Sequence, residues 1–499
     1  MSPLVGGRSV WVETADIRER APLAPDARLV VDVCVVGGGI TGLLTAWELV
    51  EGGCSVVVLE SKRLAESVTG YTTAKLTSQH GLRLRAIEQA HAADAARWYG
   101  QANQQALERV FELHGALGLD GDLERREAWV YASHAGSVDA VRAEVEAAQR
   151  AGLPARWEDD VPLPVEAHGA MVFTEQAQLH PRRLLASLAD HIERRGGVLH
   201  EGTAATAIDR SSPRSIVQTE GGGVVEARHV VLATLTPRLA GSELWPRMYC
   251  HQGYAVALPV ERDPLEGGIY INADRPMRSL RTIDLGGDEL LLQVGGSAWV
   301  ADPDSGDTPW DELERWGIEH FGSAGASSAT LRWTTQDYST GDGVPFIGAL
   351  DEEGTTLGAF GFGGWGLSNA GVAARIFSDL VRGERADWHA PFAPTRSVAP
   401  VTTRTVSGHR AGLAIDGAAA IDALAPDSAL VVEVDGEEVA AYRDPDGTLH
   451  RVSAVCTHLR GIVLWDRDER EWQCPCHASR FRPDGTCVHG PASDPLPPR

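Results

Sequence analysis

The sequence predicts an α/β nucleotide-binding domain, an antiparallel sheet and a small all-β domain that follows them. A glycine turn at 37–42 joins an apolar strand to an apolar helix, as in an α/β fold. Residues 254–300 alternate between apolar and polar positions, which is typical of antiparallel strands. After residue 430, short strands alternate with Asp-Gly turns. Because 499 residues exceed what one hydrophobic core usually supports, we expect these parts to be separate domains.

The composition is that of a globular protein and argues against several kinds of partner. Hydrophobic residues make up 43% of the chain and charged residues 23%. The net charge of −24 disfavours nucleic acid and anionic membrane surfaces, because both repel an acidic protein. No apolar run reaches the about 18 residues of a spanning helix, and the N-terminus does not have the pattern of a signal peptide. We expect a cytoplasmic protein with neither a membrane nor a nucleic acid as its partner.

The segment 29–60 has the parts of a dinucleotide site in the required order. The buried strand 29–36 runs into the turn Gly-Gly-Gly-Ile-Thr-Gly, the helix 43–50 follows, and a second strand ends at Glu60. Glycine lets the backbone approach a pyrophosphate, the helix N-terminus offers N–H groups, and the acid accepts the ribose hydroxyls. A purely structural turn is the alternative, and the turn alone does not distinguish FAD from NAD. The predicted nucleotide contacts are Gly37, Gly39, Ile40, Thr41, Gly42 and Glu60.

Other stretches of the chain resemble glycine and D-amino acid oxidase-like flavoproteins. The sequence Thr-Gly-Tyr-Thr-Thr-Ala-Lys at 69–75 resembles their flavin-lining segment, and Gly-Phe-Gly-Gly-Trp-Gly-Leu at 361–367 resembles the start of their late flavin-contacting helix. Residues 178–181, 202–205 and 231–234 resemble the family's adenine-contacting stretch, and all pieces occur in the family's order. The resemblance implies FAD, with further contacts from Ser61, Thr72, Thr73, Ala74, Ala205, Thr234, Gly363, Gly364, Trp365, Gly366 and Leu367.

The same resemblance implies how the domains are laid out along residues 1–395. A doubly wound FAD domain of the Rossmann type would be built from about 28–82, 175–248 and 340–395. An interleaved antiparallel substrate domain would come from about 83–174 and 249–339. We expect residues 396–424 to be a linker, because this stretch contains several prolines and has no clear period. The small all-β domain would occupy 425–499.

Two Cys/His motifs near the C-terminal end predict a metal centre. Cys-Thr-His at 456–458 is followed, after 15 residues, by Cys-Pro-Cys-His at 474–477. Two thiolates and two imidazoles could hold zinc or a [2Fe–2S] cluster with two cysteines on one iron and two histidines on the other. With the Gly-Pro-Ala that follows at 490–492, the pattern resembles the Rieske domain. That resemblance implies that Cys456 and Cys474 bind one iron and that His458 and His477 bind the other.

The cluster loops depart from the Rieske pattern at one position. Many Rieske domains have a second cysteine in each loop and join the two as a disulfide, but Gly461 stands where the first of these would lie. We therefore expect no loop disulfide and a free Cys476. We expect Cys487 to pack in a strand, with a Cys476–Cys487 bond as the alternative, and Ser479 to donate a hydrogen bond to a cluster or cysteine sulfur.

Together the two resemblances imply a flavin-dependent oxidation of a C–N bond in a small amine or amino acid. Hydride would pass to FAD, and the electrons would then leave through the cluster to an external acceptor or to O₂. Related oxidases use a lysine from the substrate sheet to activate O₂, but the chain has only two lysines, Lys62 and Lys75. Direct reaction with O₂ by that route is therefore disfavoured. The candidate catalytic residues are Lys75, His251, Tyr254, Gln336 and Trp365, each with packing as its alternative role.

Three other functions compete with amine oxidation. The first is an NADH-dependent reductase, although Gly221–Gly223 has no following helix to complete a second nucleotide fold. The second is hydroxylation at the flavin, since Gly341-Asp342-Gly343 resembles a flavin motif of hydroxylases. The third is a redox sensor or assembly factor that binds both cofactors without turnover. The roughly 100 residues after 395 leave no room for the iron-binding catalytic domain of a Rieske oxygenase.

Overall fold

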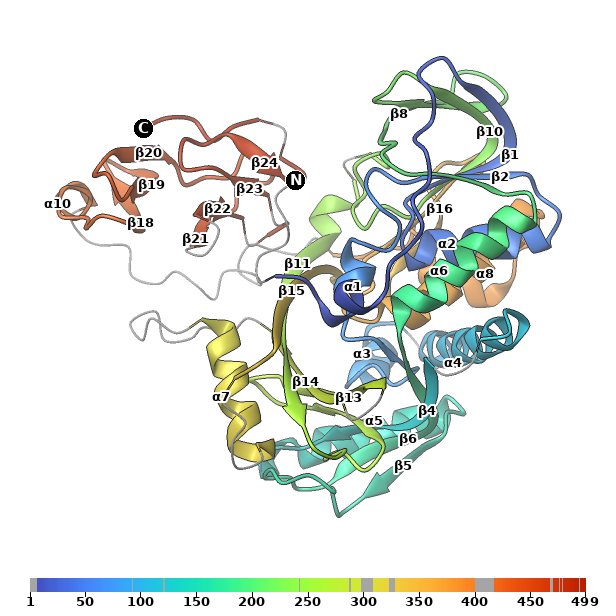
Figure 1. The fold of residues 1–499 in the computed structure, drawn as a ribbon, viewed down its shortest axis with the longest axis horizontal. Coiled ribbons are helices and arrows are strands. Elements are labelled where there is room, and N and C mark those ends of the chain that lie inside the picture. Colours follow the sequence, from blue (N-terminus) through green and yellow to red (C-terminus); the bar gives the residue numbers. More distant parts are fainter. Residues whose placement is uncertain are drawn as a thin grey trace. The chain divides into compact units, whose positions relative to one another are not determined.

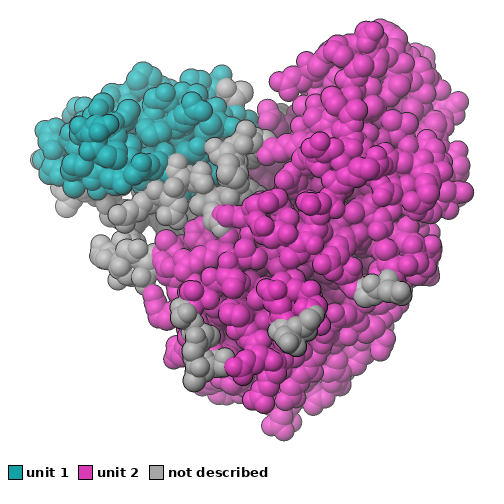
Figure 2. Space-filling model, viewed as in Figure 1, with its two compact units in different colours: residues 1–5, 242–251, 398–499 teal, residues 6–241, 252–397 magenta. Residues whose placement is uncertain are grey.

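The computed structural model divides the chain into two units (Figure 2). The large unit contains 6–241 and 252–397, and the C-terminal unit contains 1–5, 242–251 and 398–499. Residues 242–251, which we expected in the flavin and substrate segments, are therefore grouped with the C-terminal domain. The described residues are 7–91, 93–119, 122–241, 243–286, 289–297, 308–322, 328–399, 417–466, 470–474, 476–477, 479–492 and 494–499.

The first sheet of the large unit gathers strands from three separate chain segments (Figure 1). Its strands are β1 (Arg28–Val36), β2 (Val56–Leu59), β7 (Val198–His200), β8 (Ala205–Asp209), β9 (Ser215–Thr219), β10 (Val224–Leu232), β16 (Phe346–Ala349) and β17 (Thr356–Phe360). The order is β16-β17-β10-β1-β2-β7, with β9 pairing β10 and β8 pairing β9. The β17–β10–β1–β2–β7 pairs are parallel. This is the predicted doubly wound architecture.

Helices cover the first sheet because its central strands are apolar on both faces. All four residues of β2 and the last four of β1 are buried. The helices α2 (Ile40–Glu51), α6 (Pro181–Arg194) and α8 (Gly366–Val381) pack on the strands, and α2 contacts both of the others. The long α4 (Ala93–Ala116) packs on α8. The helix α2 joins the parallel neighbours β1 and β2, as α/β connections do.

The second sheet is the predicted antiparallel substrate sheet. Its strands are β3 (Lys75–Leu76), β4 (Leu123–Tyr131), β5 (Ala155–Glu158), β6 (Ala170–Leu179), β11 (Met248–Val260), β12 (Gly268–Asn272), β13 (Ser279–Gly286), β14 (Glu289–Ser297) and β15 (Leu331–Thr340). The order is β15-β11-β14-β13-β12-β4-β6-β3, with β5 on β6, and only the β12–β4 pair among those described is parallel. Lys75 therefore lies in this sheet, although we expected it in the FAD segment 28–82. Three helices lie in the same chain segments as these strands: α3 (Arg83–Ala90), α5 (Val138–Arg150) and α7 (Pro309–Phe321).

The N-terminal segment from residue 7 onward is part of the large unit. It contains a short helix, α1 (Val10–Thr14), capped by the Ser9 side chain. The indole N–H of Trp11 donates to the Thr72 carbonyl oxygen at 2.7 Å. The N-terminal segment thus supports the stretch that we expect to line the flavin.

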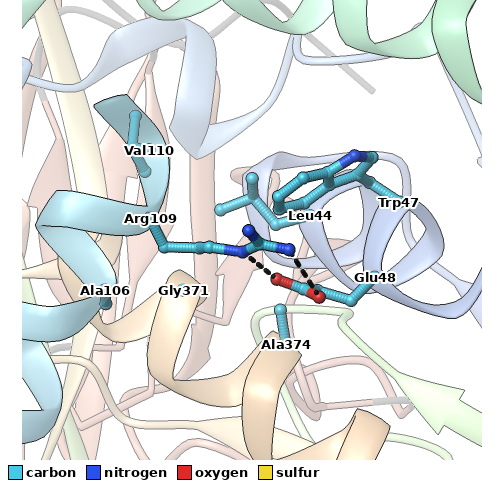
Figure 3. Close-up of a pocket in the computed structure, with 8 residues that line it drawn as sticks. All are labelled: Leu44, Trp47, Glu48, Ala106, Arg109, Val110, Gly371 and Ala374. Atoms are coloured by element: carbon cyan, nitrogen blue, oxygen red, sulfur yellow. Dashed lines mark hydrogen bonds and ion pairs between the residues drawn. The ribbon is translucent and has the colours of Figure 1, made fainter. Parts of the chain in front are cut away.

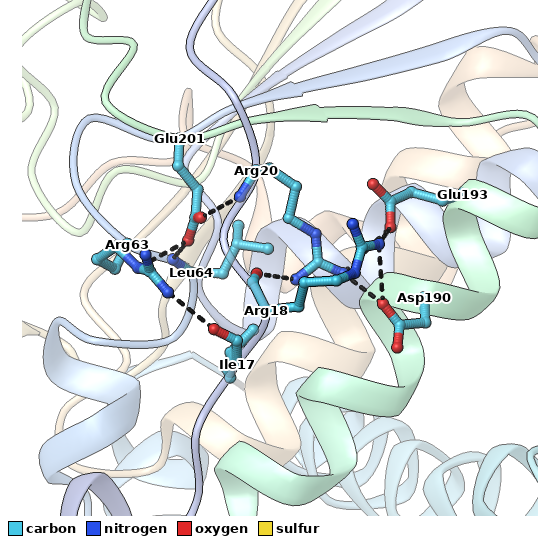
Figure 4. A network of polar contacts seen from close by, with 8 residues as sticks. All are labelled: Ile17, Arg18, Arg20, Arg63, Leu64, Asp190, Glu193 and Glu201. Carbon is cyan, nitrogen blue, oxygen red and sulfur yellow. Dashed lines mark hydrogen bonds and ion pairs between the residues drawn. The ribbon is translucent and has the colours of Figure 1, made fainter.

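A buried polar network fixes the loop that follows Glu60 (Figure 4). The two carboxylate oxygens of Glu201 accept hydrogen bonds from the backbone N–H groups of Arg20 at 2.7 Å and Leu64 at 2.6 Å. The guanidinium of Arg20, 6% exposed, pairs with Asp190 at 2.6 Å and with Glu193 at 3.1 Å. The buried charge of Arg20 is thus paired with two carboxylates. Glu201, which bonds the backbone of Arg20 and of Leu64, holds the N-terminal segment and the loop after Glu60 together.

The C-terminal unit is the predicted all-β domain. The strands are β18 (Ser428–Val434), β19 (Glu437–Arg443), β20 (Leu449–Ser453), β21 (Leu464–Asp466), β22 (Glu471–Gln473), β23 (Arg480–Phe481) and β24 (Cys487–His489). They form an antiparallel three-stranded and an antiparallel four-stranded sheet. Trp472 and Phe481 are fully buried in its core. A helix, α10 (Gly417–Asp422), lies in the stretch that we expected to be a linker, and 400–416 fall outside the described residues.

Among the described residues, no helix could span a membrane. The longest, α4, has 24 residues but carries charged side chains along its length, including Asp94, Arg97 and Glu108.

Candidate functional site

The predicted nucleotide segments meet at one edge of the first sheet. Gly37 follows β1, Glu60 follows β2, Ala233 follows β10 and Gly361 follows β17, and these strands are parallel. The carboxyl ends of parallel strands are where α/β folds bind nucleotides. The chain thus brings together segments that are up to about 320 residues apart in sequence.

The glycines at 37–42 are required by close backbone packing. A Cβ at Gly37, whose φ is +112°, would lie 2.4 Å from the Ala233 carbonyl oxygen. A Cβ at Gly42 would lie 1.8 Å from the Gly37 carbonyl oxygen. Gly39 is the N-cap of α2 and supplies no side-chain cap, so the first turn can offer its N–H groups to a pyrophosphate. The turn therefore fits a dinucleotide.

Glu60 lies against the glycine turn, as a ribose-binding acid should. One carboxylate oxygen accepts the N–H of Gly38 at 2.7 Å, and the other accepts the N–H of Lys62 at 2.8 Å and the Ser61 hydroxyl at 3.2 Å. The hydroxyl oxygen of Thr69 accepts the N–H of Ile40 at 3.1 Å. We did not predict Thr69 as a contact of the turn, although its position just before the flavin-lining Thr-Thr-Ala could have indicated it.

The predicted flavin-lining stretch 72–75 is held by backbone hydrogen bonds and ends in a buried lysine. The N–H of Ala74, at φ +56°, donates to the Thr72 hydroxyl oxygen at 3.1 Å, and its carbonyl oxygen accepts from Arg281 at 2.6 Å. The ammonium of Lys75 donates to the Ser279 hydroxyl at 2.6 Å. Burial, and then the charge of Arg281, hold the pKa of Lys75 well below its usual range. Lys75 therefore loses its proton more readily than a lysine in water does.

The second glycine turn is fastened to strand β15. Gly363, at φ +62°, donates its N–H to the Tyr338 carbonyl oxygen at 2.8 Å, and the N–H of Gly364 donates to the Asp337 carboxylate. Arg83 donates to the Gly363 carbonyl oxygen at 3.2 Å. Gln336, 7% exposed, precedes Asp337 in the same strand. The turn is thus fixed to the two residues that follow Gln336 in β15, and Gly366 and the buried Leu367 then begin α8.

Trp365, the N-cap residue of α8, stacks on a histidine that the sequence did not single out. The rings of Trp365 and His80 lie 4.6 Å apart at 18°. His80 Nδ1 lies 2.6 Å from the Tyr99 hydroxyl, and Nε2 lies 2.8 Å from the Thr77 carbonyl oxygen. Burial, then the charge of Arg83, keep the pKa of His80 well below its usual range. These hydrogen bonds hold the His80 ring in the position where it stacks on Trp365.

Other predicted residues are less closely tied to these turns. Ala205 begins β8, and the Thr234 hydroxyl donates to the Thr236 carbonyl oxygen at 2.8 Å just after β10. Tyr254, in β11, meets the Trp310 ring edge to face at 4.9 Å. His251 is grouped with the C-terminal unit. His251 nevertheless lies in β11, a strand of the substrate sheet, where we expected it.

The hydroxylase-like Asp342 is already bound within the protein. Its two carboxylate oxygens accept from Arg396 at 2.8 and 3.0 Å, and both side chains are 9% exposed. Although burial opposes it, this pairing lowers the pKa of Asp342, so the carboxylate is charged and engaged. The pair anchors the end of the predicted FAD segment.

A surface notch between helices lies apart from the predicted residues (Figure 3). Arg109 bridges it by an ion pair with Glu48 at 2.9 Å and lies 4.4 Å over the Trp47 ring. The notch is lined by Leu44, Trp47, Glu48, Ala106, Arg109, Val110, Gly371 and Ala374, none of which is a predicted site residue.

The C-terminal unit gathers the four predicted metal ligands as two pairs. The Cys456 and Cys474 thiols are buried and hydrogen-bond each other, and the imidazoles of His458 and His477 lie 5.1 Å apart, edge to face. The Cys474 thiol, with the Ser479 hydroxyl and backbone N–H groups, lowers the pKa of Cys456 to about 7. Among the described residues, no three His, Cys, Asp or Glu side chains are grouped around one point. Two pairs suit two irons.

Both imidazoles leave Nδ1 for a metal. His477 Nε2 lies 3.0 Å from the carbonyl oxygens of Trp245 and Met248, and since carbonyls only accept, Nε2 carries the proton. The Nδ1 lone pair of His477 is therefore the one that can face iron. Nδ1 of His458 is buried with no hydrogen-bond partner among the described residues. Burial lowers the pKa of His458 to about 4, so it is neutral, as a ligand must be.

Gly461 lies where a disulfide partner of Cys476 would be. A Cβ at Gly461 would lie 3.4 Å from the Cys476 Cβ, and neither Cys476 nor Cys487 forms a disulfide with another described cysteine. Cys487 lies in the strand β24, and we expected it to pack in a strand. Its thiol lies 3.1 Å from the Ala492 carbonyl oxygen. The Ser479 hydroxyl hydrogen-bonds the Cys456 sulfur and accepts the N–H of Ala492 at 3.1 Å. These contacts agree with the role expected for Ser479.

The chain is similar to redox proteins over both units. Residues 32–380 match the model of the FAD-dependent oxidoreductase family, and residues 417–498 match that of the Rieske [2Fe–2S] domain. The Bacillus subtilis (strain 168) protein YhfW, named as a Rieske 2Fe-2S iron-sulfur protein, is 31% identical over 97% of this chain and 96% of its own length. The gamma-glutamylputrescine oxidoreductase of Escherichia coli (strain K12) is 26% identical over 71% of this chain and 84% of its own.

A solved structure supports the fold. The glycine oxidase from Geobacillus kaustophilus superposes with a TM-score of 0.61 at 19% identity, covering 74% of this chain and all of that one. At that identity the likeness shows the fold alone. The predicted cofactors, FAD and a Rieske cluster, are confirmed by the two family matches. The chain belongs to the FAD-dependent oxidoreductase family and carries a C-terminal Rieske [2Fe–2S] domain.

Proposed function

We propose that this enzyme oxidises the C–N bond of a small amine or amino acid and passes the electrons through its cluster to an external acceptor. The observation that carries the proposal is that one chain combines a FAD-dependent oxidoreductase domain with a Rieske domain. FAD, when bound, takes two electrons together as a hydride equivalent, whereas a Rieske cluster takes one at a time. A protein with both can divide a two-electron oxidation into single-electron steps.

The substrate class is inferred from the relatives. Gamma-glutamylputrescine oxidoreductase and glycine oxidase are named for an amine and an amino acid. In the proposed reaction the carbon that bears the neutral amine nitrogen gives a hydride to FAD, which leaves an iminium ion, and loss of the N–H proton to solvent gives the imine. Water adds to the imine and yields a carbonyl compound and a free amine. The two electrons reach the acceptor one after the other, and O₂ remains the alternative acceptor.

Four candidate residues lie on strands and turns that border the flavin-lining stretches. We assign flavin or substrate contact to Lys75, Tyr254, Gln336 and Trp365. Lys75 directly follows Thr72–Ala74. Because its pKa is lowered, its amine can lose a proton and accept one again. Trp365 starts α8 with its ring stacked on His80, and Gln336 lies in the strand that holds the same turn. His251 has no comparable support, because it is grouped with the C-terminal unit.

We assign the cluster ligands to the two loops of the C-terminal unit. Cys456 and Cys474 would bind one iron through their sulfurs, and His458 and His477 would bind the other through Nδ1. The assignment is supported by the thiol pair, by the Nε2–carbonyl bonds that leave Nδ1 of His477 for iron, and by the buried Nδ1 of His458.

Anaerobic stopped-flow spectroscopy of the holoenzyme tests the function. The enzyme is mixed with a panel of secondary amines and amino acids, and with NADH, while flavin absorbance and cluster reduction are followed. We expect an amine to bleach the flavin first and reduce the cluster second. In Cys474→Ser the same amine should bleach the flavin without the second phase, whereas Cys487→Ser should retain both phases. Bleaching by NADH and by no amine would contradict the proposal.

A further inference from the structure

A segment from the middle of the chain binds the outer face of a proposed cluster histidine. This covering segment, residues 243–251, belongs to the C-terminal unit. The carbonyl oxygens of Trp245 and Met248 each lie 3.0 Å from Nε2 of His477. The turn η3 (Trp245–Arg247) makes this double contact, because it brings residues three apart in the chain to one side of one imidazole.

The covering segment is held to the cluster loops by further contacts. The N–H of Cys250 donates to the Cys476 carbonyl oxygen at 2.8 Å, next to His477 in the chain. The Trp245 ring meets the His458 ring at 4.9 Å and the His477 ring at 5.4 Å, edge on in both cases. Trp245 is 5% exposed and Met248 is 1% exposed. The segment is therefore packed as part of the unit's interior.

The two histidines consequently differ in what they can offer to another molecule. His477 is 5% exposed, and its only N–H is shared between two carbonyl oxygens. To bond this N–H, a partner would have to displace both carbonyl oxygens. His458 is half-buried, its Nε2 makes no hydrogen bond with the described residues, and the neighbouring Leu459 is 38% exposed.

The covering segment is encoded outside the Rieske domain. Its residues lie between β10 and the substrate-sheet part of β11, whereas the Rieske match begins at 417. Without this segment, the His477 N–H would lack both of the carbonyl oxygens that it bonds here. In this chain the hydrogen-bond acceptors for that N–H are supplied internally.

We propose that the covering segment is a built-in hydrogen-bond partner of His477 that keeps an external electron acceptor from bonding the N–H of this ligand. External electron exchange is thereby directed to His458. The inference rests on the proposed cluster ligands and makes Trp245 a positioning residue, since it acts through the two histidines and not on the substrate.

The test is the exchange of the two Nε2–H protons in the holoenzyme with a reduced cluster. After brief transfer to D₂O, electron–nuclear double resonance resolves the exchangeable protons on the remote nitrogens. We expect one of the two to exchange at least tenfold more slowly than the other. Labelling with diethyl pyrocarbonate, read by peptide mass spectrometry, should identify the slow one as His477 and the fast one as His458.

Two variants make the assignment specific to the covering segment. Trp245→Ala should raise the exchange and labelling of His477 to near those of His458, and Trp245→Phe, which keeps an aromatic edge, should restore most of the protection. Equal exchange of both protons in the wild-type enzyme would overturn the inference even if Trp245→Ala did not fold. Iron and sulfide analysis separates the two claims: a cluster with equal exchange refutes only the inference, and protein without a cluster refutes the proposed ligands as well.

Discussion

The nucleotide turn and the cluster loops prepare their sites by opposite means. The turn at 37–42 works by excluding side chains, since a Cβ at Gly42 would lie 1.8 Å from the Gly37 carbonyl oxygen. The loops that carry Cys456 and Cys474 work by presenting side chains whose donor atoms face inward. A site made of backbone depends on how distant strands pack, whereas a site made of side chains depends on a few residues of two short loops.

The comparison predicts that each site can be destroyed without the other, and Cys474→Ser should have the largest effect. Serine is a poor substitute for thiolate in an iron–sulfur site, so iron and acid-labile sulfide should fall to background while FAD stays bound. Metal and sulfide content per chain, together with flavin absorbance, measure this. Cys487→Ser is the matched control and should keep its cluster. Loss of both cofactors in Cys474→Ser would mean that the two sites are not independent.

Gly42→Ala is the reciprocal change at the backbone site. The added methyl group cannot be accommodated without moving α2 or β1, which should cost at least about 3 kcal/mol and release FAD while the cluster remains. Thermal unfolding and the flavin-to-protein ratio measure the effect. Gly115→Ala, in open space in α4, is the control and should stabilise the protein by about 1 kcal/mol. Full FAD content in Gly42→Ala would contradict the close packing at the turn.

A third change alters the cluster loops without replacing a proposed ligand. In Gly461→Cys the new Cβ would lie 3.4 Å from the Cys476 Cβ, close to the about 3.5–4.5 Å of a disulfide. The bond should form in oxidising buffer and stabilise the C-terminal unit by about 3 kcal/mol, because it closes a loop of about 15 residues. Mass spectrometry with and without reductant detects the bond. Gly461→Ala is the control, and a free thiol at 461 would show that the loops lie farther apart.

The same contrast explains how much could be predicted from the sequence. Both sites have short local signatures, so the glycine turn, Glu60 and the four Cys/His residues could be named from spacing. The alternation after 254 predicted the antiparallel sheet for the same reason. These patterns reflect local geometry, and local geometry is what a sequence displays most directly.

What could not be predicted depends on tertiary contacts between distant residues. Nothing near 243–251 indicates that Trp245 packs against histidines more than 200 residues later. Arg83 and His80 support the second glycine turn from a segment almost 300 residues earlier, with no motif of their own. Asp342 had a motif-like neighbourhood, yet its partner Arg396 turned out to be structural. Such roles are set by which elements meet, and a single sequence does not encode that in any short pattern.

The smallest predicted effect separates a side chain that tunes the cluster from those that hold it. Ser479→Ala removes the hydroxyl that hydrogen-bonds the Cys456 sulfur. That bond draws electron density from the thiolate and favours the reduced cluster, so its loss should lower the reduction potential. A hydrogen bond is worth about 1 kcal/mol and about 59 mV corresponds to about 1.4 kcal/mol, which gives a fall of about 40 mV. A potentiometric titration followed by electron paramagnetic resonance measures it, with Ser428→Ala at the half-buried start of β18 as the control. Iron content should stay full in both variants, because neither serine is a ligand. An unchanged potential in Ser479→Ala would mean that the hydroxyl serves only the Ala492 N–H, and the cluster loops would then be tuned by backbone donors, as the nucleotide turn is.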